Sequence, residues 1–171
     1  MSGTSWQLAL MRRCVALMPN RADQIRLGFF KLTTPMLVWT APRIVEVGDN
    51  ESILRIPLNW RNKNGFNSMF FGAISTGIDL TGGFYGFGLA EKANVGILYK
   101  DVSIAFKRRV DSDLTLITRD NAQVRETIEE ARQTGERLSL PVSVDGYCLN
   151  YSDEIPVVTA TATLSVKRFH L

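Results

Sequence analysis

The pattern of hydrophobic and polar residues changes period several times along the chain, and each period predicts a different element. The longest apolar stretch, residues 70–90, contains a single side chain that is charged at neutral pH, Asp79, near its centre. Bulky apolar residues cover most of the circumference when this stretch is drawn as a helix, and such a helix is normally buried. At about 100° per residue, the small and polar residues share the remaining side: Gly72, Ser75, Thr76, Asp79, Gly83 and Gly86. We therefore predict a buried central helix.

The small residues of this predicted helix lower its intrinsic helix propensity but allow other groups to approach it closely. Each glycine costs roughly 1 kcal/mol relative to alanine, so packing has to stabilise the helix. Glycines let another backbone or a thin ligand come near. A carboxylate among them is costly to bury unless it is paired or used, which makes Asp79 a candidate functional residue. It could also serve structure alone, by hydrogen bonding to Ser75, Thr76 or a loop amide.

Two helical segments precede the strands of the predicted domain. Apolar residues at helical spacing predict a helix over residues 6–18, which Pro19 ends. A second helix, capped by Asp23, is expected to run through Phe30 and to end before Pro35. We expect these helices to form an N-terminal extension, residues 1–40, that covers an edge or face of the main domain, residues 41–171.

The period changes to that of strands after the extension. Short β-type runs at Arg43–Val47 and Ile53–Trp60 flank a turn at residues 48–51. Leu54, Ile56, Leu58 and Trp60 share one face of the second run, and Pro57 places that run at an edge or a bulge. The asparagine-rich loop 61–67 then leads into the central helix, where it either serves structure or lines a site.

Strands dominate the chain after the central helix. We predict strands at residues 95–99 and 102–110, a strand at 114–118, an exposed helix at 122–134 capped by Asn121 or Asp120, and two long strands at 137–151 and 157–169. The two long strands are expected to pair across a turn at residues 152–154. Strands in succession imply an antiparallel sheet, so we predict an α+β fold in which a curved sheet wraps the central helix.

Composition narrows the possible functions. The net charge is +3 with scattered basic residues, which does not favour nucleic-acid binding. Two distant cysteines, Cys14 and Cys148, and one histidine argue against a metal site and a disulfide framework, so we expect buried thiols in a reducing, cytoplasmic compartment. Arg12 and Arg13 interrupt the first apolar segment, which does not resemble a signal peptide. Asp79 and the glycines argue against residues 70–90 as a membrane span.

The order of elements, together with particular residues, resembles the hotdog fold, and specifically the acyl-CoA thioesterases of the phenylacetate-pathway type and their uncharacterised relatives. The family motif is an Asn, a Gly, a His-Gly-Gly and a carboxylate seven residues after the last Gly. Aligned with this chain, it places the Asn at Asn64, the last Gly at Gly72 and the carboxylate at Asp79. Residues 101–116 look like the strand pair that follows the helix, and the resemblance covers roughly residues 43–169.

The resemblance implies a thioester hydrolase that acts on acyl-CoA or acyl-carrier protein, with coenzyme A as part of the substrate and no separate cofactor. Backbone amides near Phe71 and Gly72, at the helix N-terminus, would stabilise the oxyanion. Asp79 would be general base or nucleophile, and Asn64 would orient the water or the thioester. The resemblance implies a dimer with the acyl-CoA lying between subunits. Because long alternating strands leave edges that one small domain covers poorly, we predict a homodimer with its sheets joined edge to edge, or a tetramer of two such dimers.

Other residues are expected to contact the substrate or the site lining. Surface cations would bind the CoA phosphates, and residues of the central helix would line the cleft: Lys107, Arg108, Arg109, Phe70, Phe71, Ser75, Thr76 and Gly83. The basic cluster could equally be a solvated strand end.

The chain departs from the family motif at three positions. Phe70 stands where the motif has His, Phe71 stands where it has the first Gly, and Arg109 replaces a Pro that often follows the basic residues. The loss of the His favours a second hypothesis, a non-catalytic hotdog protein that binds an acyl or CoA ligand or serves as an assembly scaffold. The carboxylate in register favours the hydrolase.

Overall fold

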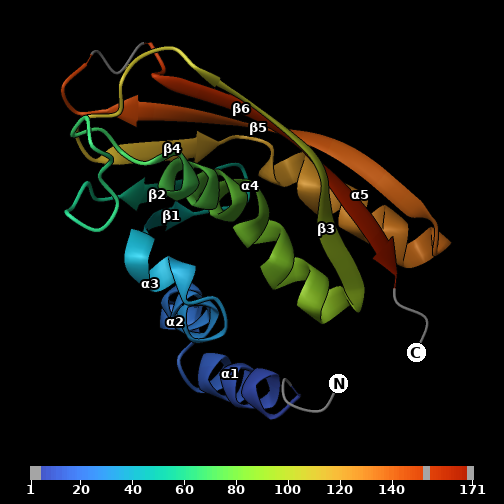
Figure 1. Ribbon diagram of the computed structural model, residues 1–171. Coiled ribbons are helices and arrows are strands. Elements are labelled where there is room, and N and C mark those ends of the chain that lie inside the picture. The colour runs from blue at the N-terminus through green and yellow to red at the C-terminus, as the bar shows by residue number, and fades with distance from the viewer. Residues whose placement is uncertain (1–4, 152–154, 169–171) are drawn as a thin grey trace.

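The computed structural model describes residues 5–151 and 155–168 and has an α+β architecture (Figure 1). Helices and strands follow one another in the order α1 (Ser5–Leu17), η1 (Pro19–Arg21, a 3₁₀ turn), α2 (Ala22–Thr33), α3 (Met36–Thr40), β1 (Arg43–Val47), β2 (Ser52–Ile56), α4 (Phe71–Ala93), β3 (Val95–Phe106), β4 (Leu114–Thr118), α5 (Asn121–Thr134), β5 (Arg137–Cys148) and β6 (Val158–Arg168).

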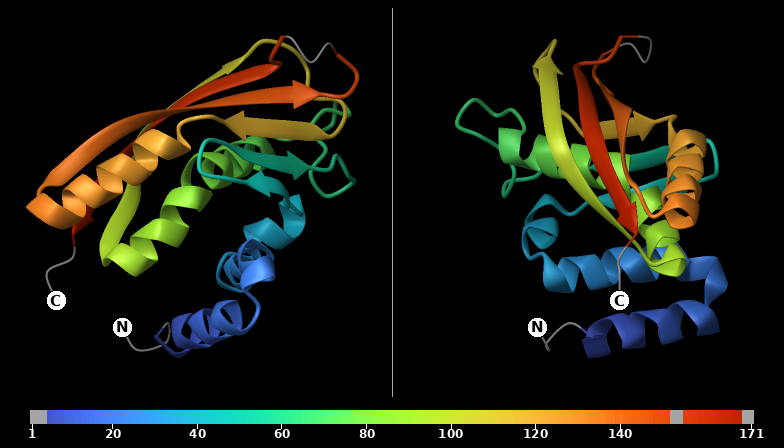
Figure 2. Two further views of the ribbon diagram at one scale, coloured as in Figure 1. Left: turned by 180° about the vertical axis from the view of Figure 1, so that it is seen from behind. Right: turned by 90° about the vertical axis from the view of Figure 1, so that its right-hand side faces the viewer.

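One antiparallel sheet holds the six strands in the order β1-β2-β4-β5-β6-β3. The sheet curves over α4, and the N-terminal helices stack beneath that helix (Figures 1 and 2). The predicted fold, an antiparallel sheet wrapped around a long central helix with additional N-terminal helices, is therefore confirmed. The topology leaves β1 and β3 as the two edges of the sheet.

The central helix α4 is apolar on nearly all sides because different elements cover different faces. Ile74 and Ile78 pack in one core cluster with Ile56 and Leu116 of the sheet. Phe84 lies in another cluster with α2, where Phe30 meets its ring edge-on at a centroid distance of 5.8 Å. The C-terminal half packs against α5 and the ends of β5 and β6. Packing on several sides thus stabilises a helix whose glycines lower its intrinsic propensity.

The second predicted strand is shorter than expected. It ends at Ile56, before Pro57, and β2 pairs with both β1 and β4, so the expectation of an edge or a bulge was wrong. The chain then turns: the Asn62 side-chain amide donates to the Pro57 carbonyl at 2.9 Å. Trp60, predicted to share the apolar face, is 81% exposed.

The strand after α4 differs from its predicted pattern. Residues 95–106 form one continuous strand, and an extra residue, Lys100, bulges out between Tyr99 and Asp101. The predicted extension through residue 110 was wrong, because the chain leaves the sheet after Phe106. The first of the two long strands also ends earlier than predicted, at Cys148, and the second begins at Val158 and runs to the last described residue, Arg168. The turn predicted at residues 152–154 and the predicted strand end at residue 169 lie outside the described residues.

The remaining helices show three further differences. The short helix α3 was not predicted. Arg21, not Asp23, occupies the N-cap of α2, and Asp23 instead pairs with Arg26 at 2.9 Å. Helix α5 is not simply exposed, since one face buries Val124 and Ile128 against α4. Both cysteines are free thiols; Cys148 is buried, whereas Cys14 is only half-buried.

Candidate active site

Asp79 lies in a pocket between α4 and the edge strand β3. The pocket has a volume of about 360 Å³, and its lining is mostly apolar: Phe71, Ser75, Ile78, Asp79, Tyr99, Val102 and Ile104. Residues from β3 reach the pocket because Tyr99, Val102 and Ile104 all point toward the helix; the bulge at Lys100 absorbs the extra residue between them. The pocket therefore combines one carboxylate with an apolar wall at an open edge of the sheet.

The environment of Asp79 disfavours its charged form. Its side chain reaches solvent on one side, while the apolar wall removes water from the other. This partial burial raises the pKa of the Asp79 carboxyl above its ordinary value. No described cation forms an ion pair with it. A carboxylate with a raised pKa and no fixed partner is a better base than an ordinary aspartate.

Two hydroxyl groups flank this carboxylate. The Tyr99 hydroxyl donates to the backbone carbonyl of Asp79 at 2.6 Å, which anchors the edge strand to the helix. Burial and the nearby carboxylate raise the pKa of Tyr99 far above its ordinary value, so the phenol stays neutral. Ser75 lies one turn before Asp79, and its buried hydroxyl has no hydrogen-bond partner among the described residues. That hydroxyl is available to a ligand in the pocket.

Tyr99 was missed by the sequence analysis. Its signal was a polar aromatic residue at the end of the apolar run 95–99, but the bulge after it broke the alternation and hid which face it occupied. Gly83, predicted to line the cleft, explains the position of the ring: a Cβ on Gly83 would lie 2.9 Å from the Tyr99 hydroxyl. Gly83 therefore makes room for Tyr99 and contributes no surface to the pocket.

The N-terminus of α4 presents backbone amides without a side-chain cap. Phe70 is the extended N-cap residue, and its amide donates to the Asn62 carbonyl at 2.7 Å. The amides of Phe71 and Gly72, in the first turn, have no partner among the described residues. The Phe70 ring lies over Gly72, where an added Cβ would meet a ring carbon at 2.7 Å. Gly72 thus accommodates the aromatic ring that replaces the motif histidine.

A second pocket of about 430 Å³ brings Asn64 together with the basic cluster. Its lining comes from the loop before α4, the first turns of α4, the last residue of β3 and the segment after it: Asn64, Ser68, Met69, Phe71, Ile74, Phe106, Lys107, Arg108, Arg109 and Val110. The structure thereby places Asn64 beside the three predicted phosphate-binding cations and in a different pocket from Asp79.

Loop contacts already occupy much of this second site. The Asn64 Oδ1 accepts from the amides of Phe66 and Ser68 at 2.9 and 3.1 Å, which closes the asparagine-rich loop. Arg108 lies over the Tyr151 ring at 5.5 Å, and Arg109 donates to the Phe66 carbonyl. Lys107 is exposed and unpaired among the described residues, so it is the most available cation of the three.

Phe71 stands between the two pockets and lines both. Its ring meets the Phe106 ring edge-on at 5.9 Å, and both side chains are more than half exposed. The partition between a basic pocket and an apolar, carboxylate-containing pocket is therefore a pair of exposed aromatic rings.

The predicted stripe of small residues does not form one cleft. Thr76 faces α3, and its hydroxyl lies 3.2 Å from the Met36 sulfur of that helix. The same hydroxyl donates to the Gly72 carbonyl within α4 at 2.7 Å. Gly86 faces α5, and an added Cβ would lie 3.0 Å from a Val124 methyl. Only Ser75 and Asp79 of the stripe line the Asp79 pocket.

Comparison with known families shows where this chain belongs. Residues 24–166 match the domain of unknown function DUF4442. The chain belongs to this family. The match begins inside α2 and ends in β6, so the family's domain contains the sheet, α4, α5 and both pockets. No curated protein matches the sequence.

Solved structures show the same fold at low sequence identity. A protein of unknown function from Chlorobaculum tepidum TLS superposes with a TM-score of 0.74 at 13% identity, over 88% of this chain and 97% of that one. A Pseudomonas aeruginosa protein of unknown function, described as a probable thioesterase, gives 0.69 at 18% identity, covering 85% and 95%. A Haemophilus influenzae thioesterase gives 0.60 at 14% identity, covering 81% and 87%. The DUF4442 chain thus has the hotdog fold of these proteins.

None of the helices in the described ranges combines the length and apolar character needed to cross a bilayer.

Proposed function

We propose that this protein is a thioester hydrolase that acts on acyl-CoA or on acyl-carrier protein. The observation that carries the proposal is Asp79: a carboxylate with a raised pKa in an apolar pocket, with the unpartnered Ser75 hydroxyl one turn away. The thioesterases among the solved structures of the same fold support this choice of reaction. Coenzyme A enters as part of the substrate, so no separate cofactor is needed.

The geometry of α4 favours a site shared between two copies. Asp79 lies seven residues after Gly72, which is about 10.5 Å along a helix that rises 1.5 Å per residue. A general base acts on a group within hydrogen-bond reach or through one water. The carboxylate and the free amides of one helix therefore cannot serve the same carbonyl. We infer that Asp79 of one copy acts on a carbonyl held by the amides of the other.

The edge strand β3 is the surface on which we expect the second copy. It is twelve residues long, pairs only with β6 within the chain, and exposes the apolar side chains of Val102 and Phe106. An exposed apolar edge strand is a template for pairing with another chain. Two β3 strands joined edge to edge would make a homodimer and cover the open side of the Asp79 pocket. Further pairing to a tetramer is compatible with this arrangement.

The chemistry follows from these positions. Asp79 takes a proton from a water molecule, and the water oxygen forms a bond to the thioester carbonyl carbon. The resulting oxyanion is stabilised by the first-turn amides of Phe71 and Gly72. The carbon–sulfur bond then breaks, and the protonated Asp79 carboxyl gives its proton to the leaving thiolate, which restores the carboxylate. Direct attack by the carboxylate, through an anhydride that water hydrolyses, would use the same residues.

The second pocket fits the phosphate end of the substrate in this proposal. Lys107, Arg108 and Arg109 lie around it, and the Phe71–Phe106 pair separates it from the acyl side. Charge-assisted contacts to phosphate would be made mainly by Lys107, whose ammonium is unengaged among the described residues. The two free cysteines suit a reducing compartment, and we place the protein in the cytoplasm on that basis.

A non-catalytic acyl-binding protein is the second candidate. It is favoured by Phe70, whose ring lies over Gly72 at the helix N-terminus and leaves less room for a carbonyl oxygen. In that case the pockets would bind an acyl or CoA ligand without turnover.

Hydrolysis of a panel of acyl-CoAs, followed by release of the free thiol, separates the two candidates. We expect turnover, and we expect Asp79→Asn to lower kcat by about 10² to 10⁴, the scale of a lost general base. Glu126→Gln is the matched control, because Glu126 is an exposed carboxylate on α5 away from both pockets. Binding without thiol release, or a folded Asp79→Asn variant with wild-type turnover, would favour the binding protein.

Light scattering tests the shared site separately. We expect a dimer at micromolar concentration. A stable monomer that still hydrolyses acyl-CoA would contradict the two-copy mechanism while leaving the activity intact.

A further inference from the structure

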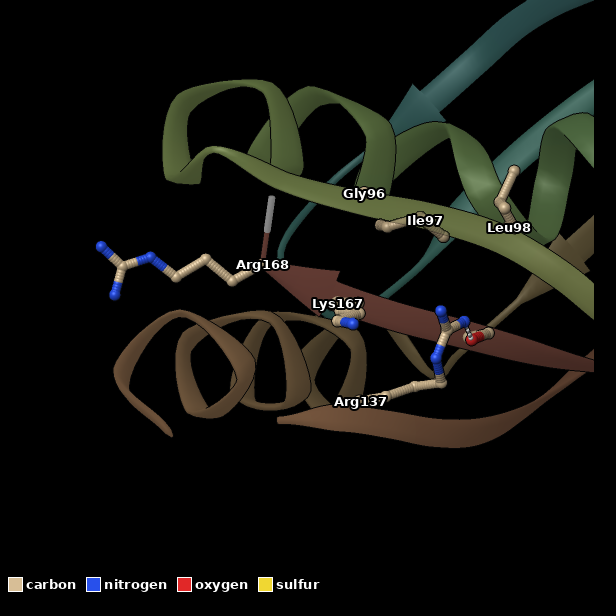
Figure 3. Close-up of a pocket in the computed structure, with 7 residues that line it drawn as sticks. Gly96, Ile97, Leu98, Arg137, Lys167 and Arg168 are labelled. Carbon is tan, nitrogen blue, oxygen red and sulfur yellow. Dashed lines mark hydrogen bonds between the residues drawn. The ribbon is translucent and has the colours of Figure 1, made fainter. Parts of the chain in front are cut away.

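A third pocket, of about 440 Å³, lies on the face of the sheet that points away from α4 (Figure 3). Gly96, Leu98, Ser165 and Lys167 alternate along β3 and β6 with residues such as Ile97 and Val166, which belong to the core beside α4. This pocket is therefore separated from the Asp79 pocket by the sheet itself. Ile97 lines the pocket as well as the core, and the other lining residues are Gly96, Leu98, Arg137, Ser165, Lys167 and Arg168.

The pocket contains a repulsive pair of cations. Arg137 on β5 and Lys167 on β6 are direct partners in the antiparallel register, so their side chains leave the same face side by side. Like charges at directly opposed positions destabilise a sheet. No described carboxylate lines the pocket, and none lies within ion-pair distance of Arg137, Lys167 or Arg168. The two cations are thus held together without a counter-charge from the described chain.

Neighbouring residues fix one cation and leave space beside the other. Arg137 Nη1 donates to the Ser165 hydroxyl at 2.9 Å, and Ser165 is only 6% exposed, so the guanidinium is held across β6. Gly96 lies opposite Lys167 on β3 and has no side chain to fill the hollow. Figure 3 shows Arg137 and Lys167 over the strand, whereas Arg168 points away to the rim.

We propose that this pocket binds the diphosphate group of a small nucleotide-like molecule, at a site separate from the proposed thioesterase centre. A guanidinium held in place by a hydroxyl acceptor keeps donors free for phosphate oxygens, and the ammonium adds a second cation. Leu98, which is 71% exposed, offers an apolar wall to the organic part of the ligand. The volume lies in the range of ordinary small-molecule pockets.

Thermal unfolding with inorganic pyrophosphate and with ADP as probes tests the proposal. Both probes should raise the Tm of the wild-type protein, because an anion relieves the repulsion only in the folded state. Lys167→Gln should start from a Tm equal to or above that of the wild type, since it removes a like charge, and should lose the ligand-induced rise. Lys100→Gln, an exposed lysine on β3 away from the pocket, is the matched control and should retain it.

Calorimetric titration completes the test. Arg137→Gln combined with Lys167→Gln should weaken pyrophosphate binding at least about tenfold, the scale of lost charge-assisted hydrogen bonds. Leu98→Ser should weaken ADP binding several-fold and leave pyrophosphate binding unchanged. Two results would overturn the proposal: unchanged pyrophosphate affinity in the double variant, or loss of binding only when Lys107 and Arg108 are replaced, which would move the anion to the basic pocket beside Asn64.

Discussion

The two halves of α4 have almost the same apolar character in sequence and very different surroundings in the structure. The C-terminal half is enclosed by the chain itself, with α5 on one side and the ends of β3, β5 and β6 on others. The N-terminal half is covered by the sheet on one side and contacts α3 through Thr76. Its other side, with Phe71 and Asp79, opens at the edge of the sheet. The difference teaches that apolar character alone does not say whether a surface is core or site.

Gly86→Val should disrupt the packing of the enclosed C-terminal half of α4 and have the largest effect on the free energy of unfolding. An added Cβ at this position already lies 3.0 Å from a Val124 methyl and 3.1 Å from an Ile97 methyl, and valine adds two further methyl groups. Overpacking of this kind costs about 1–3 kcal/mol or more. Urea unfolding measures the loss. A variant as stable as the wild type would mean that α5 can move away from α4 without cost.

Gly88→Ala is the matched change in the same half, and it should stabilise the protein. A Cβ there would meet the Arg26 guanidinium at 3.5 Å, which is ordinary van der Waals contact. Alanine gains up to about 1 kcal/mol of helix propensity over glycine. The same urea experiment should show a higher midpoint, and a lower midpoint would show that the contact with Arg26 is tighter than its geometry indicates.

Phe71→Ala tests the open half and should have little effect on stability. The lost edge-to-face pair with Phe106 is worth about 0.5–1.5 kcal/mol in general, and the exposure of both rings favours the lower end. The change removes the partition between the two pockets, so the preferred acyl chain in the acyl-CoA panel should become larger. Thermal unfolding together with KM values across the panel measures both effects. An unchanged preference would show that the ring does not bound the acyl site.

The smallest expected effect is the change in stability with pH that comes from ionisation of Asp79. Because burial raises the pKa of Asp79, the folded state holds its proton more tightly than the unfolded state. The charged carboxylate therefore lowers stability as pH rises from its ordinary pKa of about 3.9 toward the raised value. Asp79→Asn should have a higher Tm than the wild type at neutral pH and a similar Tm below that ordinary pKa. A lower Tm at neutral pH would show that the carboxylate makes stabilising contacts.

Much of the fold could be predicted because it depends on strong periodic signals. The apolar stretch around Asp79 predicted the central helix, and alternation predicted most strands in the right order. Element ends were less accurate where tertiary contacts decided them. The turn after Ile56 is held by the Asn62 side chain, and no local sequence pattern predicts that contact. Helix α3 is only five residues long, too short to show a period.

The candidate site was predicted less completely because side-chain direction decides it. Asp79 and Ser75 were placed on the same side of the helix, and both line the pocket. Thr76 was grouped with them, yet it faces α3. Tyr99 depends on a bulge that reverses the apparent alternation of β3, so the sequence placed a break where the strand continues. A pattern with period two cannot reveal an extra residue without the partner strand.

Both edges of the sheet carry such an extra residue: Val45 in β1 and Lys100 in β3. A bulge twists an edge and interrupts its row of backbone donors and acceptors, and a lysine there adds charge, so both features discourage uncontrolled strand addition. In β3 the interruption leaves only residues 101–106 as a regular edge beside the Asp79 pocket. Deletion of Lys100 would restore a long, even edge without changing which side chains face α4. We expect such a variant to keep its fold and to aggregate into fibrillar species more readily than the wild type.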